Sequence, residues 1–197
     1  MVRKRNMKYL VILFCLFFIL VFSTGSDAMD SSISDKSQDT EVYLKNNIHA
    51  QQGYKDVKAS YANWTNPGNG HVIIPVNTPI TISEFKRGLM INNQDNGMVI
   101  FFEYHPINMG MSINEYIELI ASPTPVSLDG FSPTDLKGIQ NGKVYLGMTK
   151  EGVRIALGYP AKHRTVSLEE NTWIYWVNRF TTTAVEFDDT GKVIQIR

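Results

Sequence analysis

The stretch that decides the fold lies near the end of the chain. Residues 142–160 read GKVYLGMTKEGVRIALGYP, residues 171–176 read NTWIYW, and residues 184–196 read AVEFDDTGKVIQI. The Thr149 hydroxyl can accept from the first free N–H groups of a helix, and Gly158 followed by Pro160 can end it. Gly152, inside this helix, either permits a close backbone approach to a strand or is a tolerated defect. The buried face would consist of Val153, Ala156 and Leu157.

Three strands are predicted after this helix. They span residues 172–177, 182–187 and 192–196, with a turn at 188–191. Because side chains alternate along a strand, one face of the first strand carries Trp173 and Tyr175. Ile174 and Trp176 lie on the other face, which indicates a sheet covered on both sides. With a short helical turn at 134–139, this part is one or two helices followed by an antiparallel meander.

Residues 41–120 are predicted to form a β-rich domain. Strand signals occur at residues 42–44, 57–64, 72–82 and 98–104, with a hairpin turn at 92–97. Pro75 and Pro79 interrupt the third of these, so it lies at a sheet edge or crosses a corner. Short strands with little helix suggest a small barrel. Ser112 and Glu115 form a capping box that predicts a helix to Ile120, and residues 121–133 are predicted to be a linker.

The N-terminus has the pattern of a secretory signal peptide. Four basic residues precede an unbroken apolar run over residues 9–22, and the small residues Ser26 and Ala28 flank Asp27. This predicts a signal peptide over residues 1–28, with an uncleaved membrane anchor as the alternative. The Ser- and Asp-rich residues 29–40 are predicted to be a disordered tether. The only cysteine, Cys15, lies in the middle of the apolar run, so no lipid anchor is expected.

Cleavage after Ala28 would leave 169 of 197 residues and no cysteine. An exported chain tolerates disulfides, so this one must rely on its core, and a chain of this length buries roughly 70% of its unfolded surface. Removal of four basic residues and one acidic residue from nineteen of each gives a net charge of −3. Such a chain lacks the clustered basic face typical of nucleic-acid binding.

Several of these segments together resemble a known family. The helix preceded by Gly-Met-Thr-Lys and followed by Leu-Gly-Tyr-Pro, the strand at 171–175 and the hairpin at 185–194 are similar to the SmpA/OmlA family of BamE-like outer-membrane assembly lipoproteins. The resemblance covers residues 134–197 and implies helices packed on a three-stranded antiparallel sheet. Residues 74–82 resemble an element of bacterial SH3-like domains. The expected fold class is therefore α+β, a small SH3-like barrel followed by a BamE-like domain.

Two departures limit what this family resemblance implies. Family members are usually lipidated, whereas this chain has no cysteine at the required position, and residues 41–120 have no counterpart in the minimal family. The same layout resembles the repeat of β-lactamase inhibitor proteins, which bind another protein.

No catalytic or metal-binding pattern is recognisable in the chain. The four histidines, His49, His71, His105 and His163, show no helical i, i+4 spacing and have no cysteine partner. Surface or strand-end positions are predicted for them, and neither a metal nor a cofactor is expected. Glu103 and His105 point to the same side of a strand and form the one acid–base pair worth naming.

Aromatic residues in the last third suggest a binding surface. Most of them are expected in the core, but Trp176, Arg179 and Phe180 run off a strand end into a loop, and Tyr159 could join them. Trp and Arg at a rim are typical contact anchors. The expected function is a non-enzymatic interaction protein of the periplasm or envelope that supports outer-membrane or envelope assembly. Its partners would be envelope proteins, membrane-associated ones included, and not nucleic acid.

Three alternatives to this function remain open. The β-rich half could be a cell-wall module that binds peptidoglycan, or the chain could inhibit an extracytoplasmic enzyme. A hydrolase whose site is assembled from loops is the third.

Overall fold

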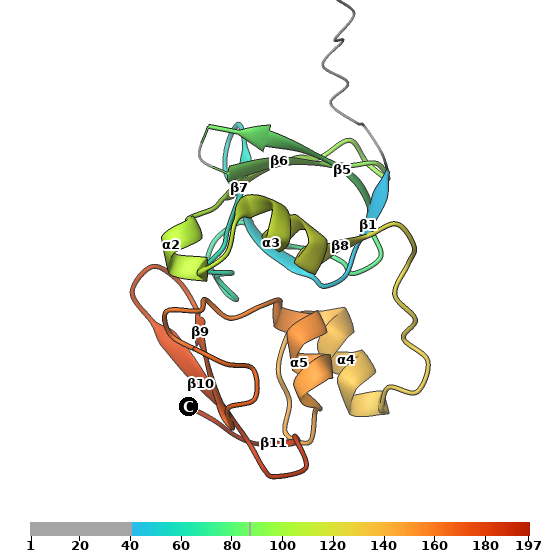
Figure 1. The fold of residues 1–197 in the computed structure, drawn as a ribbon. Helices are drawn as coiled ribbons and strands as arrows, with labels where there is room; N and C mark the ends of the chain where they lie inside the picture. The colour runs from blue at the N-terminus through green and yellow to red at the C-terminus, as the bar shows by residue number, and fades with distance from the viewer. Residues whose placement is uncertain (1–40, 87) are drawn as a thin grey trace, which may run out of the picture. The chain divides into compact units, whose positions relative to one another are not determined.

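The computed structural model describes residues 41–86 and 88–197. The predicted signal peptide and tether lie outside this part of the chain. The fold is α+β, with a curled eight-stranded sheet that forms a half-barrel and a separate three-stranded sheet (Figure 1). Within the described ranges, no helix combines the length and apolar character needed to cross a membrane.

The large sheet has the strand order β4-β2-β3-β7-β6-β5-β1-β8. Neighbouring strands are antiparallel except β3 and β7, which are parallel. Its strands are β1 (Val42–Leu44), β2 (Ile48–Gln52), β3 (Val57–Ser60), β4 (His71–Ile74), β5 (Pro79–Phe85), β6 (Gly88–Asn93), β7 (Val99–Glu103) and β8 (Ala121–Ser122).

The inner face of this sheet carries the first hydrophobic core. Helix α3 (Ile113–Ile120) lies across the inside of the curled sheet, and the short α2 (Pro106–Met109) precedes it (Figure 1). Tyr116 of α3 stacks at a tilt on Phe102 and Tyr104, with ring centroids 5.6 and 4.9 Å apart. The capping box predicted at Ser112 is present in full.

The stretch at 72–82, predicted as one interrupted strand, forms the two strands β4 and β5, and the predicted edge position holds for β4 alone. Strand β4 lies at one edge, whereas β5 lies between β6 and β1. Asn77 in the connection has a φ of +66°, a left-handed conformation that asparagine tolerates better than most residues. The predicted strand at 57–64 is too long, because it ends at Ser60 and Asn63 turns the chain with a φ of +49°.

The predicted linker at 121–133 is also partly wrong. Its first two residues form β8, which pairs with β1 at the sheet edge. Farther along, the Asn77 side chain accepts from the Val126 N–H at 2.7 Å and donates to the Val126 carbonyl at 2.9 Å. The connection between the two halves is therefore fixed to the first sheet at two places.

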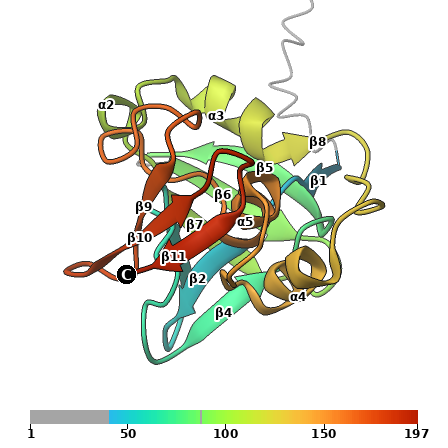
Figure 2. The same cartoon turned by 90° about the horizontal axis from the view of Figure 1, so that it is seen from below.

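The second half contains α4 (Pro133–Asn141), α5 (Lys150–Leu157) and the strands β9 (Thr172–Trp176), β10 (Thr182–Phe187) and β11 (Val193–Ile196). The sheet order is β11-β10-β9, a meander as predicted, and α5 lies behind it (Figure 2). Residues 142–146, predicted as extended, form no strand. A second core joins α5 to the inner faces of the strands. Its largest members are Trp173, Tyr175, Phe187, Met148 and Ile155.

Asp135 joins the starts of α4 and α5. Its carboxylate accepts from the Ser132 N–H and hydroxyl at one oxygen, and from the Thr149 N–H at 2.7 Å at the other. Burial alone would raise the pKa of Asp135, but the hydrogen bonds from Ser132 and Thr149 bring it below its usual range. A β-carbon on Gly152 would lie 2.2 Å from this carboxylate. The close approach at Gly152 is therefore to a side chain of the neighbouring helix.

Asn47 joins the ends of the same two helices to the large sheet. Its amide N–H groups lie 2.7 Å from the carbonyl of Ile139 in α4 and 3.2 Å from that of Ala156 in α5. Its backbone N–H donates to Ile155 at 2.8 Å. Asp135 contacts the starts of both helices and Asn47 contacts their ends. The two helices therefore run in the same direction. The last carbonyls of a helix lack partners within it, and here the first half of the chain supplies donors to Ile139, Ile155 and Ala156.

Candidate functional site

The four predicted contact residues separate into two pairs. Tyr159 and Trp176 are half-buried and pack against the first core. The Arg154 guanidinium donates to the Tyr159 hydroxyl at 3.0 Å and lies over its ring. The Arg164 guanidinium lies 5.2 Å from the Trp176 ring centroid. These two aromatic residues thus already have intramolecular partners.

Arg179 and Phe180 lie at the tip of the hairpin between β9 and β10. The Phe180 side chain is among the most exposed large apolar groups of the described chain, at 87%, and the Arg179 guanidinium lies 5.8 Å from its ring centroid. The Asn178 side chain accepts from the backbone N–H groups of Phe180 and Thr181, which fixes the turn. The hairpin therefore presents an aromatic ring and a cation on a defined loop.

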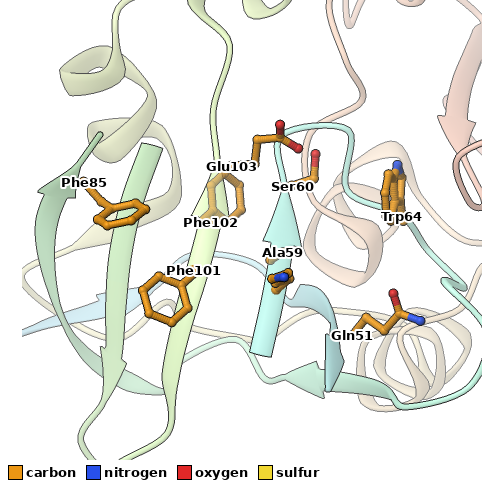
Figure 3. A pocket seen from close by; sticks show the side chains of 9 residues that line it. Gln51, Ala59, Ser60, Trp64, Phe85, Phe101, Phe102 and Glu103 are labelled. Carbon is orange, nitrogen blue, oxygen red and sulfur yellow. The ribbon is translucent and has the colours of Figure 1, made fainter. Parts of the chain in front are cut away.

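A groove of about 350 Å³ lies on the outer face of the large sheet. Figure 3 shows Phe85 and Phe101 on one side of it and Trp64 on the other, with β3 between them. Polar side chains share the lining with the rings. The complete lining consists of Gln51, Lys58, Ala59, Ser60, Trp64, Phe85, Phe101, Phe102 and Glu103.

Strand register explains how the groove is built. Lys58 is opposite Gln51 on β2 and opposite Phe101 on β7, so an amide, an ammonium group and a ring form one row across the sheet. Two residues farther on, Ser60 is opposite Glu103. Side chains two apart share a face, so both rows face away from the core.

Gly88 leaves free space in the second row of side chains, the row of Ser60 and Glu103. Gly88 of β6 is the register partner of both Glu103 and Phe85, and it contributes no side chain between them. Its φ is +150°, and a β-carbon there would lie 2.0 Å from the Phe102 carbonyl oxygen. The Phe85 ring, 50% exposed, lies 5.5 Å from that of Phe101 with a 58° angle between the planes.

Trp64 is held in place from both sides. The left-handed Asn63 precedes it, and the Asn63 N–H donates to the Ser60 carbonyl at 2.7 Å. After it, the Thr65 N–H donates to Trp176 at 3.0 Å and the Asn66 N–H to Val177 at 2.9 Å. The loop that carries Trp64 is thus tied to the end of β9, so the ring is presented by an ordered backbone.

Glu103 and His105 form the predicted pair. The His105 Nε2 atom lies 3.1 Å from a Glu103 carboxylate oxygen, and both side chains are about half exposed. The edge of the Tyr61 ring meets the His105 ring at 5.2 Å. The pair lies at the end of β7 beside the groove, so its carboxylate has a partner before any ligand arrives.

The prediction of a surface or strand-end position is wrong for His49, which is 1% exposed. Its ring stacks on His71 with centroids 5.3 Å apart, and its Nε2 atom lies 2.9 Å from the Ala156 carbonyl oxygen. Burial lowers the pKa of His49 to about 4. Burial and the nearby Lys143 also lower the pKa of His71. This pair was missed because the two residues lie on different strands.

Among residues 41–86 and 88–197, no three His, Cys, Asp or Glu side chains gather as a metal site. No family model, curated protein or solved structure matches the chain. The similarity of residues 134–197 to the SmpA/OmlA family, and that of residues 74–82 to SH3-like domains, therefore stay predictions.

Proposed function

We propose that the protein is a non-enzymatic, exported interaction protein that supports assembly or integrity of a bacterial envelope by holding a partner protein. The observation that carries this proposal is the hairpin tip between β9 and β10. An 87% exposed phenylalanine there has an arginine guanidinium beside it. Aromatic and arginine side chains are the residue types that dominate binding energy at protein interfaces.

The support for the hairpin tip is well ordered. Trp173 and Tyr175 of β9 are buried under α5, and the Asn178 side chain fixes the turn that follows. A contact group on such a support loses little conformational freedom on binding, which favours affinity. The two helices on a three-stranded antiparallel sheet also agree with the layout that the SmpA/OmlA resemblance implies. We propose the BamE-like relationship on that basis, with a partner of its own.

Site-specific crosslinking in cells tests this proposal. A photo-crosslinking amino acid replaces Phe180 in the full-length chain, and adducts from the envelope fraction are identified by mass spectrometry. We expect one recurrent envelope protein. That protein, once purified, should bind the wild-type chain and bind Phe180→Ala about tenfold more weakly, the loss of 1.4 kcal/mol expected of an anchor residue.

The matched control places the crosslinker at Tyr54. This side chain is 99% exposed in the turn between β2 and β3. It is therefore as accessible to other proteins as Phe180 but lies outside the hairpin. Equal adducts from both positions would contradict the proposal. So would an unchanged affinity of the Phe180→Ala variant for the captured protein.

A further inference from the structure

We infer that the groove on the outer face of the large sheet binds a polysaccharide built of N-acetylated amino sugars, such as the glycan strand of a bacterial cell wall. This inference is independent of the partner proposed for the hairpin tip, because it uses residues of the other half. It assigns a ligand class to Phe85 and Phe101 on the sheet face and to Trp64 in the loop after β3, whose rings are partly exposed instead of packed in the core.

The rings provide flat apolar surfaces at both sides of the groove (Figure 3). A pyranose ring has an apolar C–H face and a rim of polar substituents. A binding site for it therefore needs aromatic faces with hydrogen-bonding groups between them. Specific sites of this kind place a few polar groups in a mainly apolar lining. The groove has that composition, with Trp64 opposite the Phe85 and Phe101 pair.

The polar groups of the groove cover both hydrogen-bonding roles. The Lys58 ammonium group donates and the Glu103 carboxylate accepts. The Gln51 amide nitrogen donates one N–H to the Asn69 carbonyl at 3.1 Å, which leaves its second N–H and its oxygen for a ligand. An acetamido group carries one N–H donor and one carbonyl acceptor, which the two strand rows can meet. The Lys58 side chain is 69% exposed and has Asp56 at 3.1 Å, so it remains accessible to a ligand.

Other ligand classes fit the groove less well. An extended peptide that adds to a sheet needs a free strand edge, but β3 is paired with β2 on one side and β7 on the other. Single-stranded nucleic acid needs a positive track for its phosphates beside the stacking rings. The charged lining residues here are one lysine and one glutamate, which cancel. An apolar lipid chain would form no favourable contact with Lys58 or Glu103, which argues against a lipid ligand.

The length of the groove and the fixed position of Trp64 also suit a sugar chain. Adjacent strands lie about 4.8 Å apart, so the row from Gln51 through Lys58 to Phe101 extends over three strands and can follow consecutive residues of a linear polymer. Trp64 is fixed by bonds of its neighbours to Ser60 and β9. A fixed ring avoids the ordering cost that a mobile side chain would meet on binding.

Calorimetric titration of the purified chain with an N-acetylglucosamine hexasaccharide tests this inference. We expect saturable binding by the wild type and about tenfold weaker binding by Trp64→Ala and by Phe101→Ala. Tryptophan fluorescence should change on titration in the wild type and in Phe180→Ala but not in Trp64→Ala, which assigns the change to Trp64 among the three tryptophans. Lys58→Ala serves as a second variant, because an exposed side chain can be shortened without affecting the core, and it should weaken binding about threefold.

Control variants and probes decide the outcome. Phe180→Ala should keep wild-type affinity for the hexasaccharide, whereas Trp64→Ala should still crosslink its protein partner through position 180, so failures at the two surfaces are distinguishable. The inference is overturned if the wild type does not bind the hexasaccharide. It is also overturned if well-folded Trp64→Ala and Lys58→Ala bind it as the wild type does, or if the groove variants instead lose binding to a single-stranded oligonucleotide or to lipid vesicles.

Discussion

His49 receives a hydrogen bond from His71 across 3.0 Å, between its Nδ1 atom and the Nε2 atom of the neighbouring ring. The direction follows from the other side of the ring, where the Nε2 atom faces the Ala156 carbonyl oxygen. A carbonyl only accepts, so His49 carries a proton on Nε2. Because burial lowers the pKa of His49 to about 4, its Nδ1 atom is unprotonated at neutral pH and accepts from His71. A second proton on Nδ1 would displace that hydrogen bond.

The stability of the protein should therefore fall as the solution becomes acidic. The folded-state pKa of His49 is about 4 against an ordinary 6.5, so the unfolded chain binds more protons than the folded chain between these values. Stability is complete above about pH 6.5 and declines below it, by about 3 kcal/mol from His49 at pH 4. His71, facing Lys143, acts in the same direction.

Thermal unfolding of the wild type and of His49→Gln across pH 7 to 4 measures this loss. Glutamine keeps a donor for Ala156 but does not titrate, and the comparison removes the contribution of carboxylates such as Asp135. The variant should show the shallower decline. Parallel curves for the two proteins would contradict the assignment.

Replacement of Asn47 should be among the most destabilising polar substitutions. Asn47→Ala leaves the Val76 N–H without its side-chain acceptor and removes one donor each from the Ile139 and Ala156 carbonyls, which keep the Gly142 N–H and His49. An unsatisfied buried group costs about 1–3 kcal/mol and a lost hydrogen bond about 1 kcal/mol, so we expect a total loss of about 3 kcal/mol in urea unfolding.

The neighbouring Asn46 provides the matched control for Asn47. It is equally buried, but its side-chain oxygen has no hydrogen-bond partner among the described residues. Its amide donates only to Asn47. Asn46→Ala should therefore cost clearly less than Asn47→Ala, and an equal cost would count against the role given to Asn47.

Gly152→Ala should destabilise the protein although alanine favours helices. The new β-carbon would meet the Asp135 carboxylate at 2.2 Å and displace it from Thr149. We expect a net loss of about 2 kcal/mol, larger than the gain of about 1 kcal/mol in helix propensity.

A double-mutant cycle isolates this contact between the helices. In an Asp135→Ala background the two closest atoms of the carboxylate are removed and only the Asp135 β-carbon remains, at 3.0 Å from the new β-carbon, so Gly152→Ala should cost clearly less there. Equal effects of Gly152→Ala in both backgrounds would exclude Asp135 as the cause. The exposed neighbour Glu151 gives a reference, because Glu151→Ala should change stability by no more than about 0.5 kcal/mol.

Trp176→Ala and Phe180→Ala should differ in stability although both residues were predicted as contact anchors. The Trp176 ring packs on the first core and under Arg164, so its loss should cost about 2 kcal/mol, less than for a fully buried tryptophan. Phe180, being exposed, should change unfolding by no more than about 0.5 kcal/mol. Chemical denaturation of the two variants compares them, and an equal loss would show that Phe180 packs within the fold.

Local signals in the sequence predicted most of the elements. The capping residues Ser112 and Thr149, the turn before Gly97 and the turn at 188–191 act over a few residues, so their physical effect is visible in a short segment. The strand at 182–187 was predicted with its observed bounds. At 57–64 the alternation of apolar residues continues past Ser60, but Asn63 takes a left-handed conformation that the pattern does not reveal.

Long-range partners could not be derived in the same way. Asn47 bonds to residues 92 and 109 positions away, and an asparagine in a polar stretch carries no sign of which helix end it will meet. The groove is a further example, because the opposition of Lys58 and Phe101 depends on the parallel pairing of β3 with β7. The sequence showed aromatic residues at 64, 85 and 101, but no local pattern placed them on one face.

The Asn77–Val126 bonds affect how copies of the chain can associate. Exchange of one half between two molecules requires a connection that can swing open. Here residue 126 is hydrogen-bonded to Asn77, in the connection between β4 and β5. Only residues 127–132, between that point and α4, are left to extend toward a neighbouring molecule. The two hydrogen bonds between Asn77 and Val126 therefore disfavour domain-swapped dimers and keep the two halves of each molecule packed on each other.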